Sequence, residues 1–271
     1  MDDRQFIIAC EKELRYIEKQ ELKLQKQAMA PERAWKQTIE GAIPDKVYDK
    51  LRAAFAAAFK MIFEKGVNVI EKTYSRDKLM KDFELNDMAV DSFRSRRELR
   101  KFRSDVSSSH TWKSILTTVE GMGLGAIGIG MPDIVIFLGF VLQSIYEVAL
   151  KYGYDYNDKA ERVFILKMMS ASIARREKWL KADKEVEEMI RNPIEVDFDV
   201  LDSQISDTAD DFALDMLVLK FIQGKPIVGI IGGLSNPIYY NKIMEYVKLK
   251  YHKRYLLSKK AEVLNTKEEI E

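Results

Sequence analysis

Apolar residues recur at three- and four-residue spacings along most of this chain, which is the pattern of amphipathic helices. In residues 2 to 28 they form one stripe that comprises Phe6, Cys10, Leu14, Ile17, Leu24 and Ala28. Similar stripes predict further helices over residues 45 to 74, 85 to 106, 162 to 190, 212 to 221 and 237 to 259. Only the stretch 194–200 alternates with a period of two, and it has no partner strand. The sequence therefore predicts an all-α protein.

The stretch from Val119 to Asp155 departs from this pattern because much of it is apolar on all sides. Six of the chain's 13 glycines fall between Gly121 and Gly139, and Asp133 is the only charged residue from Gly121 to Leu142. A span of that length can cross a bilayer, but Pro132 before Asp133 favours two short helices that form a hairpin. We expect a single-domain helical bundle with this glycine-rich apolar hairpin buried at its centre. Insertion of the hairpin into lipid stays open.

Small residues four positions apart let two helix backbones approach closely. The helix-packing candidates are Gly121, Gly125, Gly130, Gly229 and Gly233. Residues 123–128 also match the dinucleotide fingerprint G-x-G-x-x-G, but the flanking segments have helical periodicity and no strand precedes them. The packing interpretation is therefore favoured over nucleotide binding.

Several residues predict where helices end and begin. Gly153 suits the left-handed position after a helix, and Asp158 with Glu161 resembles a capping box that starts the next one. Asn192 before Pro193 ends a helix, and an acidic extended connector is expected over residues 194–200. We divide the chain into an N-terminal amphipathic helix (residues 1–30), a main helical domain (31–260) and a charged C-terminal tail (261–271).

Charge is balanced overall but uneven locally. The formal net charge is +1, so no global field favours nucleic acid. Twelve carboxylates lie between Asp183 and Asp215, whereas a short stretch is crowded with the cations Arg94, Arg96, Arg97, Arg100, Lys101 and Arg103. This run is either a solvated helix face or a contact for lipid head groups, phosphate or the chain's own acidic stretch. Nucleic acid ranks lower because only Phe93 and Phe102 accompany the cations.

Catalytic signatures are scarce in the sequence. Four acids are candidates for a polar cluster: Glu120, Asp133, Glu147 and Asp155. For each of them a helix cap or a salt bridge is favoured over catalysis. One cysteine and two histidines do not form a recognisable metal motif, so we expect no metal and no cofactor.

Three blocks of the sequence together resemble the EcsC family of bacterial proteins. The first runs from Glu120-Gly121 through the glycines to Asp133, and the second comprises residues 152–155 (YGYD) with Glu161. The third is residues 225–233 (KPIVGIIGG) with Asn236, followed by a helix that carries Tyr251, Arg254 and Leu256. The resemblance implies a mostly helical protein, from a family named for a gene associated with an ABC transporter operon involved in secretion. It implies no established catalytic activity or cofactor.

We therefore hypothesise a non-enzymatic accessory or interaction protein, located in the cytoplasm, with a peripheral contact to the inner membrane left open. Its expected partners are a membrane surface or a membrane-protein complex, and no nucleic acid is expected. Two alternatives stay open, namely a hydrolase-like enzyme that uses the clustered carboxylates and a protein whose glycine-rich hairpin inserts into a membrane. The sequence does not reveal the oligomeric state.

Overall fold

The computed structural model describes residues 3–31, 44–71, 74–107, 132–193, 195–222 and 237–268, and these are helical without any strand. The predicted all-α fold is confirmed. The elements are α1 (Asp3–Ala28), α3 (Asp45–Met61), a π-helical segment (Ile62–Gly66), α4 (Val67–Ile70), α5 (Arg76–Phe93), α6 (Arg96–Ser107), α8 (Pro132–Lys151), α9 (Lys159–Ile173), α10 (Arg176–Arg191), α11 (Phe198–Ile222) and α13 (Pro237–Glu268).

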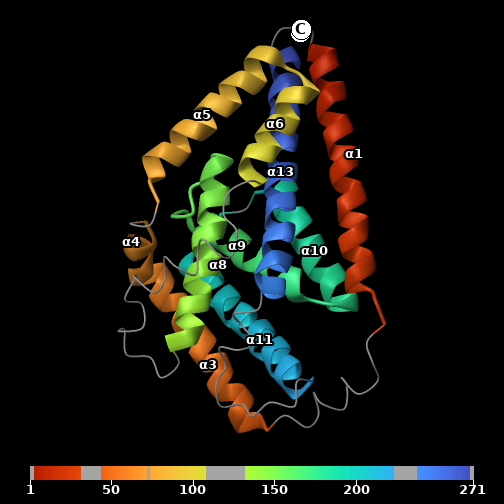
Figure 1. The fold of residues 1–271 in the computed structure, drawn as a ribbon. Coiled ribbons are helices and arrows are strands. Elements are labelled where there is room, and N and C mark those ends of the chain that lie inside the picture. Colours follow the sequence, from red (N-terminus) through yellow and green to blue (C-terminus); the bar gives the residue numbers. More distant parts are fainter. Residues whose placement is uncertain are drawn as a thin grey trace.

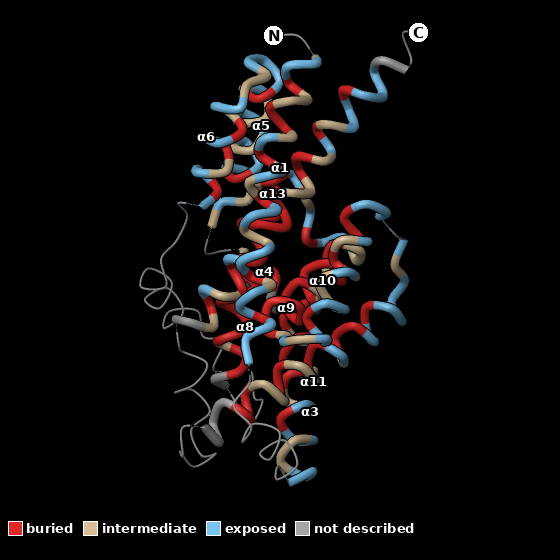
Figure 2. The backbone as a smooth tube through the Cα atoms, turned by 90° about the vertical axis from the view of Figure 1, so that its right-hand side faces the viewer, coloured by how far each residue is buried: buried red, intermediate tan, exposed pale blue. Residues whose placement is uncertain are grey.

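Helix α13 runs from one end of the molecule past its centre and organises the bundle (Figure 1). Helix α1 lies beside it, the α5–α6 pair covers its C-terminal part, and α9 crosses the centre. Helix α11 packs between α3 and α9 at the other end. The first residues of α1 and the last turns of α13 lie at the same end of the molecule, and buried residues line the helix faces that meet inside (Figure 2). Helix α13 continues through residue 260 without a break.

Several expected boundaries differ from the structure, and three of the differences have a visible local cause. The helix expected over residues 85–106 is two helices, because Arg94 adopts a left-handed conformation (φ 46°) that ends α5. The segment expected to continue as one helix from 162 to 190 breaks between α9 and α10, where Arg176 has a φ of 50°. The prediction of an extended acidic connector was wrong from Phe198 onward. The Asp197 carboxylate accepts the Val200 N–H (2.9 Å), so α11 starts there.

Of the expected glycine-rich hairpin, only the part from Pro132 onward lies within the described residues, and it forms α8. Residues 121–131 and the stretch that contains Gly229 and Gly233 lie outside the described residues. Within α8, Ile134–Lys151 is long and apolar enough to cross a membrane, with a mean hydropathy of 1.8, but 89% of this window is buried inside the protein. In the described structure α8 is therefore a core helix, packed against α3, α5 and α13.

Gly153 ends α8 as predicted. Its φ is +81°, its N–H donates to the Leu150 carbonyl (3.0 Å), and the Tyr154 N–H donates to the Ala149 carbonyl (2.9 Å). These two bonds satisfy carbonyls that the last helical turn leaves free, and they define a Schellman cap. A Cβ at position 153 would lie 2.5 Å from the Phe83 ring, so α5 also requires glycine here.

We expect Gly153→Ala to lower the free energy of unfolding by more than about 1 kcal/mol, because it adds left-handed strain to a clash with Phe83. Urea unfolding of Gly153→Ala, Phe83→Ala and the double variant separates the two effects. The cavity in Phe83→Ala should relieve the clash, so the double variant should be more stable than the sum of the single changes implies. Strict additivity would show that Phe83 does not restrict this position.

A buried lysine joins α13 to two other helices. The Lys250 side chain is fully buried, and its Nζ lies 2.7 Å from Glu21 of α1 and 2.8 and 2.6 Å from Asp183 and Glu187 of α10. Lys253 adds ion pairs with Glu21 (2.9 Å) and Glu187 (2.8 Å). Burial alone would raise the pKa of Glu187, but the charge of Lys250 and the hydrogen bonds from both lysines lower it to about 2.

This lowered pKa predicts acid sensitivity. A carboxyl group that titrates near pH 2 in the folded chain and near pH 4.5 when unfolded stabilises the fold fully above about pH 5, and this stabilisation is lost as the pH falls toward 2. Between pH 6 and pH 3, Glu187 should account for on the order of 2 kcal/mol of lost stability.

Urea unfolding at the two pH values measures this loss. Glu187→Gln should flatten the pH dependence, whereas Glu188→Gln, next along α10 and 62% exposed, should not. Equal pH slopes for wild type and Glu187→Gln would contradict the assignment.

Candidate functional site

The four candidate acids do not form a shared site in the described structure. Glu120 lies outside the described residues, and the side chain of Asp133 is not described. Glu147 is buried in α8 and accepts a hydrogen bond from the Gln143 amide (3.3 Å). Asp155 is 53% exposed and pairs with Arg76 of α5 (2.8 Å). The described pair thus has separate partners, as expected for structural carboxylates.

Two blocks of the family resemblance meet instead around Glu161. The Asp158 carboxylate caps α9 by accepting the Ala160 N–H (3.1 Å), but Glu161 does not complete the expected capping box. Its side chain turns into the core, where it accepts the Tyr251 hydroxyl (2.5 Å) and pairs with Arg254 (2.7 Å), both from α13. The Arg254 guanidinium also lies over the Tyr154 ring, 3.8 Å from its centroid.

This network is a buried charge pair in which one Glu161 oxygen contacts Tyr251 and the other contacts Arg254. Burial raises the pKa of Glu161, while Arg254 and the Tyr251 hydroxyl oppose this effect. Burial and the nearby Glu161 charge raise the pKa of Tyr251 well above its usual value. The tyrosine therefore stays a hydrogen-bond donor at neutral pH, and the three groups lock α9 onto α13.

A second tyrosine network lies at the other side of the 152–156 block. The Tyr74 hydroxyl donates to the Tyr156 hydroxyl (2.9 Å), which donates to Glu71 (2.5 Å). Tyr146 of α8 stacks on Tyr156 with centroids 4.1 Å apart. Burial is the first cause that raises the pKa of Tyr156, to about 12. These contacts link the connection between α4 and α5 to α8 and the segment after it, and periodicity did not reveal them.

His252 is the one histidine in the described residues. It is fully buried beside Tyr152, and neither ring nitrogen has a hydrogen-bond partner in the described structure. Burial lowers the pKa of His252 to about 3, with a further decrease from Arg103, so the ring is neutral at physiological pH. Within the described ranges no three His, Cys, Asp or Glu side chains group as metal ligands.

The basic run is divided by the structure into an inner and an outer set. Arg94 pairs with Asp3, and Arg96 pairs with Glu13, whose carboxylate is fully buried in α1 (2.7 Å). Arg103 lies 3.5 Å from the other Glu13 oxygen and over the Tyr16 ring. Arg96 and Arg103 thus fasten α6 to α1, and Arg94, which follows the last residue of α5, contacts the start of α1.

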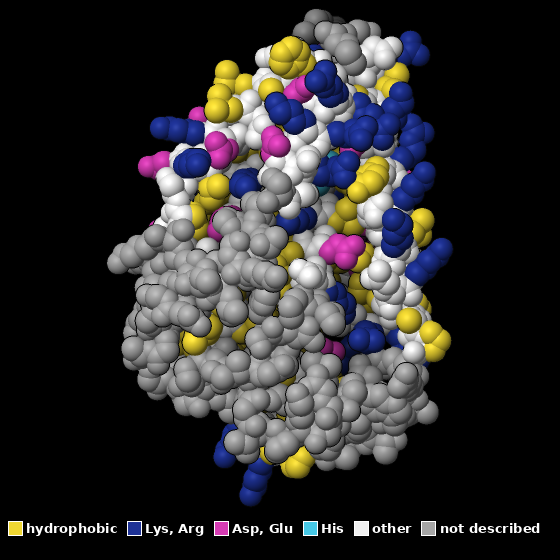
Figure 3. Space-filling view, in the orientation of Figure 1, with side chains coloured by type: hydrophobic (Ala, Val, Ile, Leu, Met, Phe, Trp, Pro, Cys, Tyr) yellow, Lys and Arg dark blue, Asp and Glu magenta, His cyan; other side chains and the backbone are white. Residues whose placement is uncertain are grey.

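The outer set is the surface of α6 that faces solvent. Arg97, Arg100 and Lys101 are exposed, and within the described residues none of them forms an ion pair. They line a hollow of about 590 Å³ together with Arg96, Arg103, Ser104 and Ser107. Leu99, Phe102 and Val106 occupy the opposite face and are buried. We call Arg97, Arg100 and Lys101 the basic surface. In Figure 3, dark blue side chains lie over α6 and along the neighbouring α1.

The acidic stretch is not the partner of this surface in the described contacts. Asp183 and Glu187 pair with Lys250, and Glu185 pairs with Lys167 of α9 (2.6 Å). Further along, Asp202 and Asp210 of α11 pair with Lys60 and Arg52 of α3. The described contacts therefore do not support the hypothesis that the basic run pairs with the chain's own acidic stretch.

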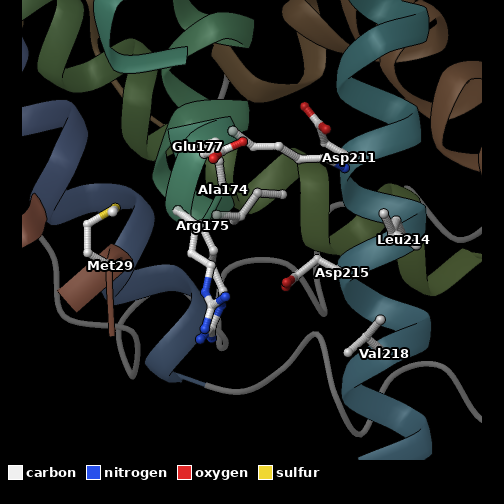
Figure 4. A pocket seen from close by; sticks show the side chains of 11 residues that line it. Met29, Ala174, Arg175, Glu177, Asp211, Leu214, Asp215 and Val218 are labelled. Atoms are coloured by element: carbon white, nitrogen blue, oxygen red, sulfur yellow. The ribbon is translucent and has the colours of Figure 1, made fainter. Parts of the chain in front are cut away.

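A second hollow, also about 590 Å³, lies between the α9–α10 turn and α11 (Figure 4). Asp211 and Asp215 lie on the α11 side, and Met29 and Arg175 lie across from them. Asp215 accepts the Tyr239 hydroxyl, and Arg176 holds the turn in a left-handed conformation. Neither Glu147 nor Asp155 lines this hollow, so it does not support the hydrolase hypothesis built on the predicted acids.

We expect Arg254→Met to lower the free energy of unfolding by about 3–5 kcal/mol, because it leaves the Glu161 charge buried without its cation. Adding Glu161→Gln should recover part of this loss. Arg191→Met serves as a control, since Arg191 is 68% exposed and its removal should change stability by less than about 0.5 kcal/mol. Equal losses for Arg254→Met and Arg191→Met in thermal or urea unfolding would contradict a structural role for the pair.

Comparisons with known proteins support the resemblance seen in the sequence. Uncharacterized protein YdbA of Bacillus subtilis (strain 168) is 39% identical over 59 residues, which is 21% of this chain and 22% of that protein. The match thus spans about a fifth of this curated relative. No solved structure matches the chain. The model of the EcsC protein family, in contrast, matches residues 9–256. Because this match covers nearly the whole sequence, including α9 with Glu161 and α13 with Arg254, the chain belongs to the EcsC protein family.

Proposed function

We propose that this EcsC family member is a non-enzymatic accessory protein that binds the anionic cytoplasmic face of a membrane through the basic surface of α6. The observation that carries this proposal is the outward set Arg97, Arg100 and Lys101, which lacks a carboxylate partner within the described residues. Clustered cations near an anionic leaflet contribute about 1 kcal/mol each, and salt screens this attraction.

The inner arginines explain why the surface can hold its cations in place. Arg96 and Arg103 form ion pairs with buried Glu13, so α6 is fixed to α1 before any ligand binds. The apolar residues Leu99, Phe102 and Val106 fix its other side. The basic surface is thus a rigid, preformed contact that needs no ordering of the helix. Work beside an ABC transporter or secretion system is the biological setting that family membership suggests.

Co-sedimentation with phosphatidylglycerol-containing vesicles tests the proposal. The wild type should pellet at low salt and be released at high salt, and Arg97→Glu/Arg100→Glu/Lys101→Glu should stay in the supernatant. Arg96 is left unchanged because its loss would unpair Glu13. Lys178→Glu/Lys181→Glu/Lys184→Glu is a charge-matched control on exposed positions of α10 and should still pellet.

Three outcomes would overturn the proposal. They are absence of binding at low salt, equal loss in the α10 control, and binding of phosphatidylcholine vesicles as strong as binding of anionic ones. Tighter binding of short duplex DNA than of anionic vesicles, lost in the α6 variant, would assign the basic surface to nucleic acid instead.

A further inference from the structure

Helix α5 carries large apolar side chains on its outer side. Leu85, Met88 and Phe93 are 66%, 63% and 64% exposed, and Met80 is 43% exposed. The inner side of the same helix is already satisfied, because Leu79 and Val90 are buried and Phe83 packs near Phe102 of α6. Single exposed apolar residues are ordinary on protein surfaces, but three such residues lie within the last nine positions of α5, and each is more than 60% exposed. We call this group, together with Met80, the apolar strip.

The strip ends beside the basic surface. Phe93 is the last residue of α5, only Arg94 and Ser95 separate it from α6, and Arg97 follows four positions after it. In Figure 1 the α5–α6 turn forms an extremity of the molecule, and Figure 3 shows apolar side chains at this edge with dark blue ones beside them. Apolar and cationic groups thus adjoin at a protruding turn.

Charge distinguishes the two ends of the strip. Near Met80, the exposed lysines 78 and 81 are accompanied by exposed Asp77 and Glu84. Near Phe93, Asp91 is half exposed and pairs with Lys259 (3.0 Å), which Asp87 and Glu262 share. The exposed cations Arg97, Arg100 and Lys101, which form no ion pair within the described residues, begin four positions after Phe93 and lie at this end of the strip.

We propose that the Phe93 end of α5 inserts into the interface of an anionic bilayer while the basic surface of α6 contacts the lipid head groups. This inference rests on the proposed function and adds an apolar component to it. An aromatic ring with cations at its side matches the chemistry of the bilayer boundary, where the ring reaches the acyl region and the cations remain at the phosphates. A globular protein partner would not need an aromatic ring and cations at these two different depths.

Insertion predicts a specific change in the environment of position 93. The only cysteine, Cys10, is fully buried, and burial raises the pKa of its thiol to about 11, so it reacts poorly with maleimides. Phe93→Cys, Met80→Cys and Phe198→Cys can therefore each be labelled with the environment-sensitive fluorophore NBD. Position 198 is a matched control because Phe198 is 68% exposed and belongs to α11.

With phosphatidylglycerol-containing vesicles, NBD at position 93 should brighten several-fold and shift to the blue, and lipids with quenchers in the acyl chains should reduce its emission. NBD at position 198 should not respond, and position 80 should respond less than position 93. The response at position 93 should disappear when Arg97→Glu/Arg100→Glu/Lys101→Glu is added.

The unlabelled chain provides a second measurement. Burial of a phenylalanine side chain favours partition strongly, so Phe93→Ser should weaken vesicle binding about tenfold at low salt, where the wild type is bound. Met80→Ser is the matched control and should have a smaller effect.

The outcomes separate this inference from the proposed function. If the chain pellets and the α6 variant does not, but NBD at position 93 stays as it is in water, the basic surface is retained and insertion is overturned. If the response at position 93 persists in the α6 variant, the role assigned to the basic surface is overturned. A lipid-free change at position 93 that grows with protein concentration would assign the strip to self-association and overturn insertion.

Discussion

The structure depends on the pairing of charges buried along α13. Lys250 reaches α1 and α10, Arg254 reaches α9, and Lys259 reaches Asp87 and Asp91 of α5. A buried charge without its partner is costly by several kcal/mol, so each cation accepts its helix in one register only. Hydrophobic burial drives these helices together, but it is less specific about their position along α13. The ion pairs therefore specify how four helices are placed around the fifth.

Much of the helical architecture could be predicted, because apolar periodicity reports which side of a helix is buried. Breaks without glycine or proline were harder to predict. Arg94 ends α5 in a left-handed conformation that usually calls for glycine or asparagine, so the residue itself gives no warning. One signal was available, since Ser95 precedes Glu98 by three positions and its hydroxyl accepts the Glu98 N–H. The start of α10 has no comparable cap, because the N-cap residue Arg175 makes no side-chain hydrogen bond to the backbone N–H groups of the first turn.

The sequence predicted which cations the candidate basic site contains, but it did not predict which of them face solvent. The crowd of arginines is visible in the sequence, yet its division depends on Glu13, which lies 83 positions from Arg96. Likewise, Glu161 occupies a position that suits a capping box, and only the fold brings Tyr251 and Arg254 to it across 90 and 93 positions. Local spacing identifies which charges exist, whereas tertiary contacts decide which of them are neutralised. Glu120 and residues 121–131 of the expected hairpin lie outside the described residues.

Neutralisation is what turns a nearly uncharged chain into one with a directed surface. The net charge is only +1, and many acids between Asp183 and Asp215 are held by cations of α3, α9 and α13. Glu13 similarly pairs with both Arg96 and Arg103 of α6 and offsets part of their charge. After these pairs form, the outer cations of α6 face solvent next to the exposed Phe93, while the same helix is held by Leu99, Phe102 and Val106. The ion pairs that fix the fold therefore also determine which cations of α6 lack a carboxylate partner among the described residues. A structural pair such as Arg96–Glu13 has to stay intact for the basic surface to keep its shape.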